Sequence, residues 1–309
     1  MCIKNSFEKS KLHLYQGNSE EILDTFENDF FDSVIIDPPY EYDAGAMEGK
    51  LKNVIDIHFN RRLVFEILTK KTKENASFVI FGRGMNLYKD AVILEELGWK
   101  FKEEIVWHKM RNSQPYMRIH RTHELALVFM KGSRAINEVW MKDYYDNQPV
   151  NSYSYHRLNS NYKTLVNAIK ERGVEKVMSL LHDNDFKQRS IYVKKQGFFS
   201  GKRNIIERDD MGIIGAFRKK LKTVINVSRE CNNVLHSTQK PVYLMSCLVE
   251  LVTNENEKVL DCFMGSGSTG EAAIMNNREF YGIELAEEFY NVSKERLINV
   301  MNNKEAALF

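Results

Sequence analysis

The sequence lacks the features of a secreted, membrane-spanning or zinc-binding protein. Its 309 residues include four cysteines, but no C-x-x-C pair, so neither a zinc knuckle nor a disulfide framework is predicted. No apolar run approaches the ~18 residues that a membrane-spanning helix needs, and no basic and apolar leader opens the chain. We therefore expect a folded protein of a reducing cytoplasm.

Net charge is also low, but the charges are unevenly distributed. The formal net charge is +2, whereas residues 133–231 contain 19 lysines and arginines against 11 acidic residues. Such a basic block attracts a polyanion such as DNA through phosphate neutralisation and counterion release. A solvated, lysine-rich surface would have the same composition.

Alternating apolar and amphipathic segments predict an α/β fold with a mostly parallel, doubly wound sheet. The pattern changes near residue 132, where tyrosine, asparagine and basic residues dominate, and it resumes after about residue 232. We therefore predict one domain in two halves, 1–132 and 232–309, around a distinct region at 133–231. Strands are expected at residues 12–15, 32–36, 78–81, 104–107, 125–130, 258–261 and 279–282.

Helices are expected between these strands. Ser19 is a candidate N-cap, with Glu21 in the first turn of its helix. Gly98 should end a preceding helix, and the residues after Val300 are expected to fray. The helices are predicted at residues 59–68, 87–97, 162–171, 174–182, 242–251, 269–275 and 287–299.

One predicted strand ends in the segment Asp37-Pro38-Pro39-Tyr40. The Asp37 carboxylate and the Pro38 carbonyl can each accept an N–H hydrogen bond from an exocyclic amine, which favours a tetrahedral nitrogen with an available lone pair. Tyr40 offers a ring on which a flat base can stack, and the two prolines stiffen the backbone. The alternative is a strand that merely ends in a proline turn.

A second strand ends in a glycine-rich segment, Asp-Cys-Phe-Met-Gly-Ser-Gly-Ser-Thr-Gly, at residues 261–270. Gly265 and Gly267 let the backbone approach a ligand closely, and a turn into a helix suits a nucleoside-containing cofactor. No Gly-Lys-Ser/Thr triplet follows, which excludes a phosphate-binding P-loop. Glu284 ends the next strand about 20 residues later, where an acid in such folds binds ribose hydroxyls; an ordinary capping or surface acid is the alternative.

Together with His-Ser-Thr-Gln-Lys-Pro at residues 236–241, these segments closely resemble the DNA amino-methyltransferases that modify adenine N6 or cytosine N4. The family's motifs resemble D-P-P-Y and D-P-F-x-G-S-G-T, and their order here looks like that of its β group. The resemblance covers roughly the first 130 and last 75 residues. It implies a Rossmann-like α/β methyltransferase sheet that is circularly permuted, mostly parallel and covered by helices on both faces, with an inserted target-recognition region.

The resemblance implies an activity as well as a fold. S-adenosylmethionine would be the cofactor, and a base flipped out of duplex DNA would be the substrate, in a bacterial, archaeal, phage or mobile-element setting. The acid-first motif favours adenine N6, because the cytosine-N4 enzymes more often begin this motif with serine. Cytosine N4, RNA as substrate and a non-catalytic DNA-binding regulator are the alternatives. A homodimer and a separate cognate restriction endonuclease are left open as partners.

The expected site residues follow from these motifs. The resemblance places Asn18 near the cofactor adenine, Lys240 near its methionine portion and residues 263–266 along its pocket. The catalytic set is Asp37, Pro38, Pro39 and Tyr40, and the cofactor set is Asn18, Asp37, Lys240, Asp261, Phe263, Gly265, Ser266, Gly267 and Glu284. Candidate DNA contacts are Arg157, Lys194, Lys195, Lys202, Arg203, Arg218 and Lys219, with the loop from Lys109 to Thr122 as a second candidate.

Histidines and cysteines can also serve in metal binding and nucleophilic catalysis, but their spacing in this sequence favours neither role. His108, His120 and His123 match no zinc spacing, so no metal is expected. Cys262 stands where the family commonly has proline, and Asn18 where it often has aspartate; the cysteine is small enough to pack, and the asparagine keeps a carbonyl acceptor. Methylation at cytosine C5 would need a cysteine in a Pro-Cys pair, which this chain lacks.

Overall fold

The structure is a computed structural model that describes residues 3–39, 60–109, 122–139, 221–228 and 239–306, together with Asn167 and Lys170. The chain divides into two compact units, Met1–Asn137 with Lys222–Phe309, and Glu138–Leu221. Nearly all of the second unit lies outside the described residues, and so do the helices predicted at 162–171 and 174–182, apart from those two residues. The fold below is that of the first unit, and the boundaries at 133 and 231 stay predictions.

Nine strands in the described part of the chain form one mixed sheet, ordered β1-β2-β9-β8-β3-β4-β6-β5-β7. Only β1 and β6 run antiparallel to their neighbours, so seven of these nine strands point the same way. The carboxyl ends of those seven strands therefore share one edge. The strands are β1 (Asn5–Lys9), β2 (Leu12–Gln16), β3 (Phe31–Ile36), β4 (Thr72–Gly82), β5 (Lys100–His108), β6 (His123–Met130), β7 (Val224–Asn226), β8 (Lys258–Asp261) and β9 (Glu279–Glu284).

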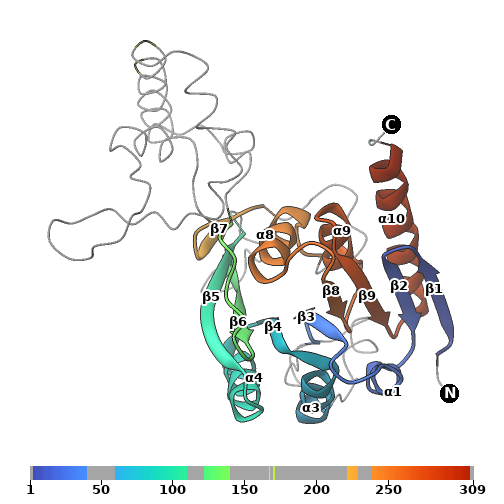
Figure 1. The fold of residues 1–309 in the computed structure, drawn as a ribbon, viewed down its shortest axis with the longest axis horizontal. Coiled ribbons are helices and arrows are strands. Elements are labelled where there is room, and N and C mark those ends of the chain that lie inside the picture. The colour runs from blue at the N-terminus through green and yellow to red at the C-terminus, as the bar shows by residue number, and fades with distance from the viewer. Residues whose placement is uncertain are drawn as a thin grey trace, which may run out of the picture. The chain divides into compact units, whose positions relative to one another are not determined.

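Helices cover both faces of the sheet, as predicted. They are α1 (Ser19–Asp24), α3 (Arg61–Lys71), α4 (Gly84–Glu96), α8 (Val242–Val252), α9 (Ser268–Met275) and α10 (Glu287–Ala306). Helix α3 contacts α1 and α4, whereas α9 contacts α8 and α10. Figure 1 shows the first group below the sheet and the second group above it. The Rossmann-like α/β class is thereby confirmed.

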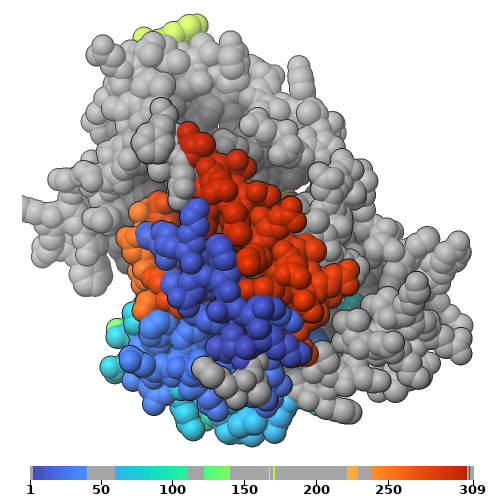
Figure 2. Space-filling view, turned by 90° about the vertical axis from the view of Figure 1, so that its right-hand side faces the viewer, coloured from blue at the N-terminus to red at the C-terminus, as the bar shows by residue number. Residues whose placement is uncertain are grey.

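The two ends of the chain build one half of the sheet together. β2 pairs in parallel with β9, from Leu12 opposite Phe280 to Gln16 opposite Glu284, and β8 pairs in parallel with β3. Figure 2 shows the first strands, in blue, beside the C-terminal segment, in red. Residues after 239 therefore complete the sheet that the first residues begin, in agreement with the permuted order.

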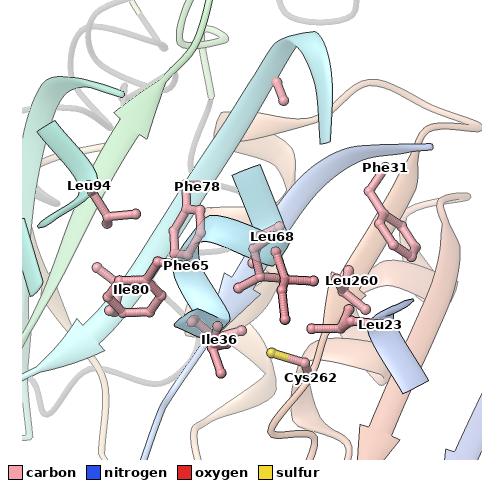
Figure 3. Close-up of a cluster of buried hydrophobic side chains, with 14 of the residues drawn as sticks. Leu23, Phe31, Ile36, Phe65, Leu68, Phe78, Ile80, Leu94, Leu260 and Cys262 are labelled. Carbon is pink, nitrogen blue, oxygen red and sulfur yellow. The ribbon is translucent and has the colours of Figure 1, made fainter. Parts of the chain in front are cut away.

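An apolar core fills the space between the sheet and the helices α1, α3 and α4. Figure 3 shows Leu23 of α1, Phe65 of α3 and Leu94 of α4 facing side chains of the strands, among them Phe78. Cys262 belongs to this core at 1% exposure, and burial raises the pKa of its thiol. The prediction that Cys262 packs is confirmed, and its burial disfavours the thiolate that a nucleophile needs.

Some local predictions were wrong. Asn18, not Ser19, caps α1: its side chain accepts hydrogen bonds from the backbone N–H groups of Glu20 (2.8 Å) and Glu21 (3.4 Å). Residues 301–306, which were expected to fray, continue helix α10; residues 307–309 lie outside the described part. Strands β1 and β7 were not predicted; β1 is largely exposed and β7 has only three residues, so neither shows an apolar pattern.

Gly282 of β9 leaves no room for a side chain beside the glycine-rich loop. A Cβ there would lie 2.3 Å from Met264 Sδ and 2.8 Å from Phe280 Cε1. We expect Gly282→Ala to lower the free energy of unfolding by about 1–3 kcal/mol through overpacking, as measured by urea denaturation. Adding Met264→Ala should recover part of that loss by making room. A Gly282→Ala variant as stable as the wild type would contradict the packing described here.

Candidate active site

The two predicted motifs lie next to each other at the carboxyl edge of the sheet. Asp37 follows β3, and Asp261 ends β8, which pairs with β3 through Val34 and Leu260. Glu284 ends β9, the neighbour of β8. Burial, together with the negative charges of Asp37 and Glu284, raises the pKa of Asp261 to about 7. The carboxylates that follow β3 and end β9 therefore act on Asp261 at this edge.

Asp37 forms an ion pair with Lys240. The Lys240 ammonium donates to Asp37 Oδ2 and lies 3.3 Å from Glu124 Oε2. Lys240 is 6% exposed and stands just before Pro241, the N-cap residue of α8. Burial alone would lower the pKa of Lys240, but the two carboxylates raise it. Lys240 thus contacts the first motif directly, and its predicted place beside the cofactor stays a prediction.

Glu124, the second carboxylate near Lys240, was not anticipated from the sequence. Strand β6 is antiparallel, so its first residues reach the edge where the other strands end, and Glu124 lies opposite Trp107. Lys109, directly after β5, donates to Glu124 Oε1. Burial would favour the neutral acid, but Lys240 and Lys109 lower the pKa of Glu124 to about 2. The only sequence signal is a carboxylate just before the apolar residues of β6.

Two aromatic rings lie beneath these ammonium groups. Lys240 Nζ is 4.9 Å from the ring centroid of Phe81 and 6.0 Å from that of Trp107, and Lys109 Nζ is 5.0 Å from Trp107. The Trp107 indole N–H donates to the Val227 carbonyl at 2.9 Å, which fixes the ring. Cation–π attraction therefore replaces part of the hydration that the lysines lose on burial.

The backbone at Pro39 is anchored to helices α3 and α4 through Arg61. Pro38 is buried, and the Pro39 carbonyl accepts a hydrogen bond from Arg61 Nη2 at 2.9 Å. Arg61 Nη1 pairs with the buried Asp90 of α4 at 2.6 Å. The role of Arg61 and Asp90 was not visible in the sequence. Tyr40 lies outside the described residues, so its stacking role stays a prediction.

Arg61 gives a test of this anchor. We expect Arg61→Lys to lower about 10-fold the turnover of the methyl transfer that the sequence resemblance implies, because lysine can keep a charge near Asp90 but cannot bind two groups in the planar geometry of arginine. Affinity for the expected cofactor should change little. Arg62→Lys is the matched control, since Arg62 pairs with Glu96 and both side chains are about half exposed. Equal turnover in the two variants would argue against the anchor.

Asp261 shapes the start of the glycine-rich loop. Its Oδ1 accepts the backbone N–H of Phe263 at 3.1 Å, and its Oδ2 accepts the hydroxyl of Thr269 at 2.6 Å. One carboxylate oxygen of Asp261 thus accepts a hydrogen bond from the loop, and the other accepts one from helix α9. Phe263 packs partly buried against the core cluster. Cofactor contact by Asp261 and Phe263 stays a prediction.

Glu284 holds the middle of the loop from the next strand. Its Oε2 accepts the N–H of Gly265 at 2.8 Å, and its Oε1 accepts the N–H of Ala286 at 2.9 Å. Gly265 and Gly267 have φ of +53° and +78°, which favours glycine at both positions. Ser266, between them, is 5% exposed. The loop is therefore fixed by acids on both sides, while the ribose contact predicted for Glu284 remains untested.

Asn18 lies close to this loop. The N–H of Gly17 donates to the Glu284 carbonyl at 3.0 Å, and the hydroxyl of Ser19 donates to the Cys262 carbonyl at 2.6 Å. The Asn18 side-chain oxygen is engaged in capping α1. Its predicted contact with a cofactor adenine would therefore share that oxygen or use the amide nitrogen.

The model of the DNA methylase family, which comprises N6 and N4 methyltransferases, matches residues 31–295 of this chain. The chain belongs to this family. Type II methyltransferase M2.LlaDCHI of Lactococcus lactis subsp. cremoris is 23% identical over 312 residues, which cover 96% of this chain and 93% of that protein. The match thus extends over nearly the whole of both chains.

Solved structures share the fold of this DNA methylase. The crystal structure of the M1.HpyAVI–SAM complex matches with a TM-score of 0.55 at 21% identity, covering 93% of this chain and 98% of that one. The cytosine-N4-specific PvuII DNA methyltransferase matches with a TM-score of 0.56 at 14% identity, covering 97% and 95%. Both likenesses support the methyltransferase architecture.

The seven residues first predicted to contact DNA in this DNA methylase lie outside the described part: Arg157, Lys194, Lys195, Lys202, Arg203, Arg218 and Lys219. Residues 110–121 of the second candidate loop also lie outside it, whereas Lys109 is buried and pairs with Glu124.

Of the three histidines considered as metal ligands, His120 lies outside the described part, whereas His108 and His123 are opposite one another in β5 and β6. Among the described residues, no group of three potential metal ligands occurs. No helix in the described ranges is both long and apolar enough to cross a membrane.

Proposed function

We propose that this DNA methylase transfers a methyl group from S-adenosylmethionine to N6 of adenine in duplex DNA. The observation that carries the proposal is the position of Asp37 at the end of β3, beside the glycine-rich loop that follows β8. Asp37 lies near enough for its charge to raise the pKa of Asp261, which holds that loop. An amine bound at Asp37 and a methyl donor bound at the loop would therefore meet.

The groups at the end of β3 suit catalysis at an amine. Asp37 and the Pro38 carbonyl would accept the two N–H groups of the target amine, which withdraws the nitrogen lone pair from the ring and aims it at the methyl group. As the nitrogen–carbon bond forms and the carbon–sulfur bond breaks, positive charge develops on the nitrogen. The Asp37 carboxylate would stabilise that charge, and the surplus proton would leave towards it or to water.

The glycine-rich loop fits the proposed cofactor. Gly265 and Gly267 allow close backbone approach, and the carboxyl groups of Asp261 and Glu284 hold this loop beside the place proposed for a ligand whose sulfonium and ammonium groups give it net positive charge. When bound, S-adenosylmethionine supplies an electrophilic methyl group. M1.HpyAVI, which shares the fold, was crystallised with SAM, and this supports the same cofactor here.

Adenine is the proposed base because the motif begins with Asp37, whereas cytosine-N4 enzymes of the family more often begin it with serine. Cytosine N4 is the second candidate, since the PvuII enzyme with the same fold is cytosine-N4-specific. A base in a duplex would have to flip out to reach Asp37. The basic block at 133–231 would bind the DNA around it. A homodimer and a cognate restriction endonuclease remain predictions.

Expression in a host whose DNA lacks both modified bases tests this proposal. We expect single-molecule sequencing to find N6-methyladenine in one short sequence context, and none in cells that carry the empty vector. N4-methylcytosine would overturn the assigned base. Unmodified DNA, from a protein that still binds S-adenosylmethionine and DNA, would favour the non-catalytic regulator.

A further inference from the structure

Four side chains of alternating charge form a row of ion pairs at the carboxyl edge of the sheet, in the order Lys109, Glu124, Lys240 and Asp37. The first three side chains are 6–8% exposed, whereas that of Asp37 is 23% exposed. The ammonium of Lys240 therefore lies between a carboxylate that opens towards solvent and a carboxylate buried on a strand. The family motifs include Asp37 and Lys240 but assign nothing to Glu124.

We propose that Glu124 is a positioning residue that holds Lys240 against Asp37 and thereby fixes the carboxylate that receives the target amine. Glu124 touches no reacting atom in this scheme. It acts through Lys240, whose ammonium is 3.3 Å from Glu124 Oε2. The inference rests on the proposed function, because it concerns how Asp37 is oriented for methyl transfer.

Asp37 by itself is a poor anchor for a buried ammonium. A buried charge is tolerated only when it is paired and hydrogen-bonded, and Asp37 stands at the start of a loop rather than within a strand. Glu124, by contrast, lies within a strand that is paired on both sides. Strand β6 lies between β4 and β5, and Glu124 is in register with Trp107. Lys240 therefore links Asp37, at the start of the loop, to a strand inside the sheet.

Lys109 completes the arrangement by balancing the charge. With Lys109 paired to Glu124, the cluster holds two cations and two anions, so no net charge is buried. The backbone N–H of Lys109 donates to the Thr122 carbonyl at 2.7 Å, which fixes the residue at the end of β5. Trp107 lies beneath both lysines. Glu124 is thereby kept ionised and available to Lys240.

This arrangement predicts a change in the pH profile that a purely structural role would not produce. Among the described residues, the charged groups around Lys240 are Asp37 at the end of β3, Glu124 on β6 and, behind Glu124, Lys109 at the end of β5. Burial lowers the pKa of Lys240, and the two carboxylates oppose this effect. Without the Glu124 charge only Asp37 opposes it, so the pKa of Lys240 falls. Loss of activity at alkaline pH should then begin at a lower pH.

Glu124→Gln is the variant that tests the proposal. We expect kcat for methyl transfer to fall about 10- to 100-fold, because a small displacement of a positioned group has effects of that size. The Kd for S-adenosylmethionine should change less than about 3-fold, and the alkaline limb should move to lower pH. Glu257→Gln is the matched control: Glu257 pairs with Arg134 just before β8, at the opposite edge of the sheet, and kcat should be unchanged.

A double-mutant cycle decides whether Glu124 acts through Lys240. In a Lys240→Gln background, adding Glu124→Gln should change kcat by less than about 3-fold, because the group it positions is gone. An equal loss in both backgrounds, or a Glu124→Gln variant with normal kcat and pH profile, would overturn the proposal. If Glu124→Gln fails to fold, Glu124→Asp replaces it, with an intermediate kcat expected and a wild-type kcat contradicting the proposal.

An inactive wild-type protein would refute the proposed function but not the pairing. Titration of Lys240 Nζ by NMR in lysine-labelled protein then tests the pairing directly. We expect its pKa to be lower in Glu124→Gln than in the wild type. An unchanged pKa would overturn the inference independently of any activity.

Discussion

Asp37→Ala should lower kcat for methyl transfer by about 1000-fold or more. Alanine removes the acceptor that would free the amine lone pair and the charge that would stabilise the developing cation, and each such group typically contributes about 10²- to 10⁴-fold. Single-turnover transfer of a labelled methyl group to duplex DNA measures the effect. Residual activity within about 10-fold of the wild type would show that Asp37 does not perform this role.

The fold should survive this substitution. Lys240 keeps Glu124 as an anionic partner at 3.3 Å, so the buried ammonium is not left without a carboxylate. We therefore expect Tm and DNA affinity, measured by fluorescence anisotropy, to change little. Asp37→Asn is the informative control, because its amide oxygen is still an acceptor. It should keep more activity than Asp37→Ala, whereas equal losses would mean that the charge alone matters.

Asp261→Asn should remove a pH-dependent contribution of up to about 4 kcal/mol to the free energy of unfolding. Burial raises the pKa of Asp261 from 3.8 to about 7, and each tenfold gain in proton affinity on folding corresponds to about 1.4 kcal/mol. The folded state therefore binds this proton more tightly than the unfolded state does. The stabilisation is present in full below about pH 4, falls as the pH rises, and is lost above about pH 7.

Urea denaturation of both proteins at pH 4.5, 6 and 8 measures this effect. Asparagine can accept the Phe263 N–H and donate to the Thr269 hydroxyl, so the loop contacts of Asp261 are kept. The free energy of unfolding of the wild type, relative to the variant, should fall steadily across this range. A constant difference between the two proteins would contradict a buried carboxyl with a raised pKa.

The strands that carry the site were predictable because buried parallel strands have continuous apolar sequences. Val34 to Ile36 and Val259 to Leu260 are fully buried between two layers of helices, and each run leads into an acid. Neighbouring parallel strands end at the same edge, so the approach of Asp37 to the glycine-rich loop also follows from the motifs. The permuted chain order was recognisable only from the order of the motifs that resemble those of the family.

The charge cluster around Lys240 could not be predicted, because it depends on strand order. Nothing local shows that β6 lies between β4 and β5 and runs antiparallel to both. That placement alone brings Glu124 to the edge where Asp37 and Lys109 lie. The Arg61 anchor was hidden likewise, since it joins two helices and a loop through side chains distant in sequence.

Incubation of the purified protein with unmethylated genomic DNA and S-adenosylmethionine carrying a deuterated methyl group is the most direct measurement. The DNA is digested to nucleosides and analysed by mass spectrometry. We predict that N6-methyladenine will carry the labelled methyl group, and that Asp37→Ala will produce none above background. Label on N4 of cytosine would contradict the assigned base, and DNA without label would contradict methyl transfer to DNA itself.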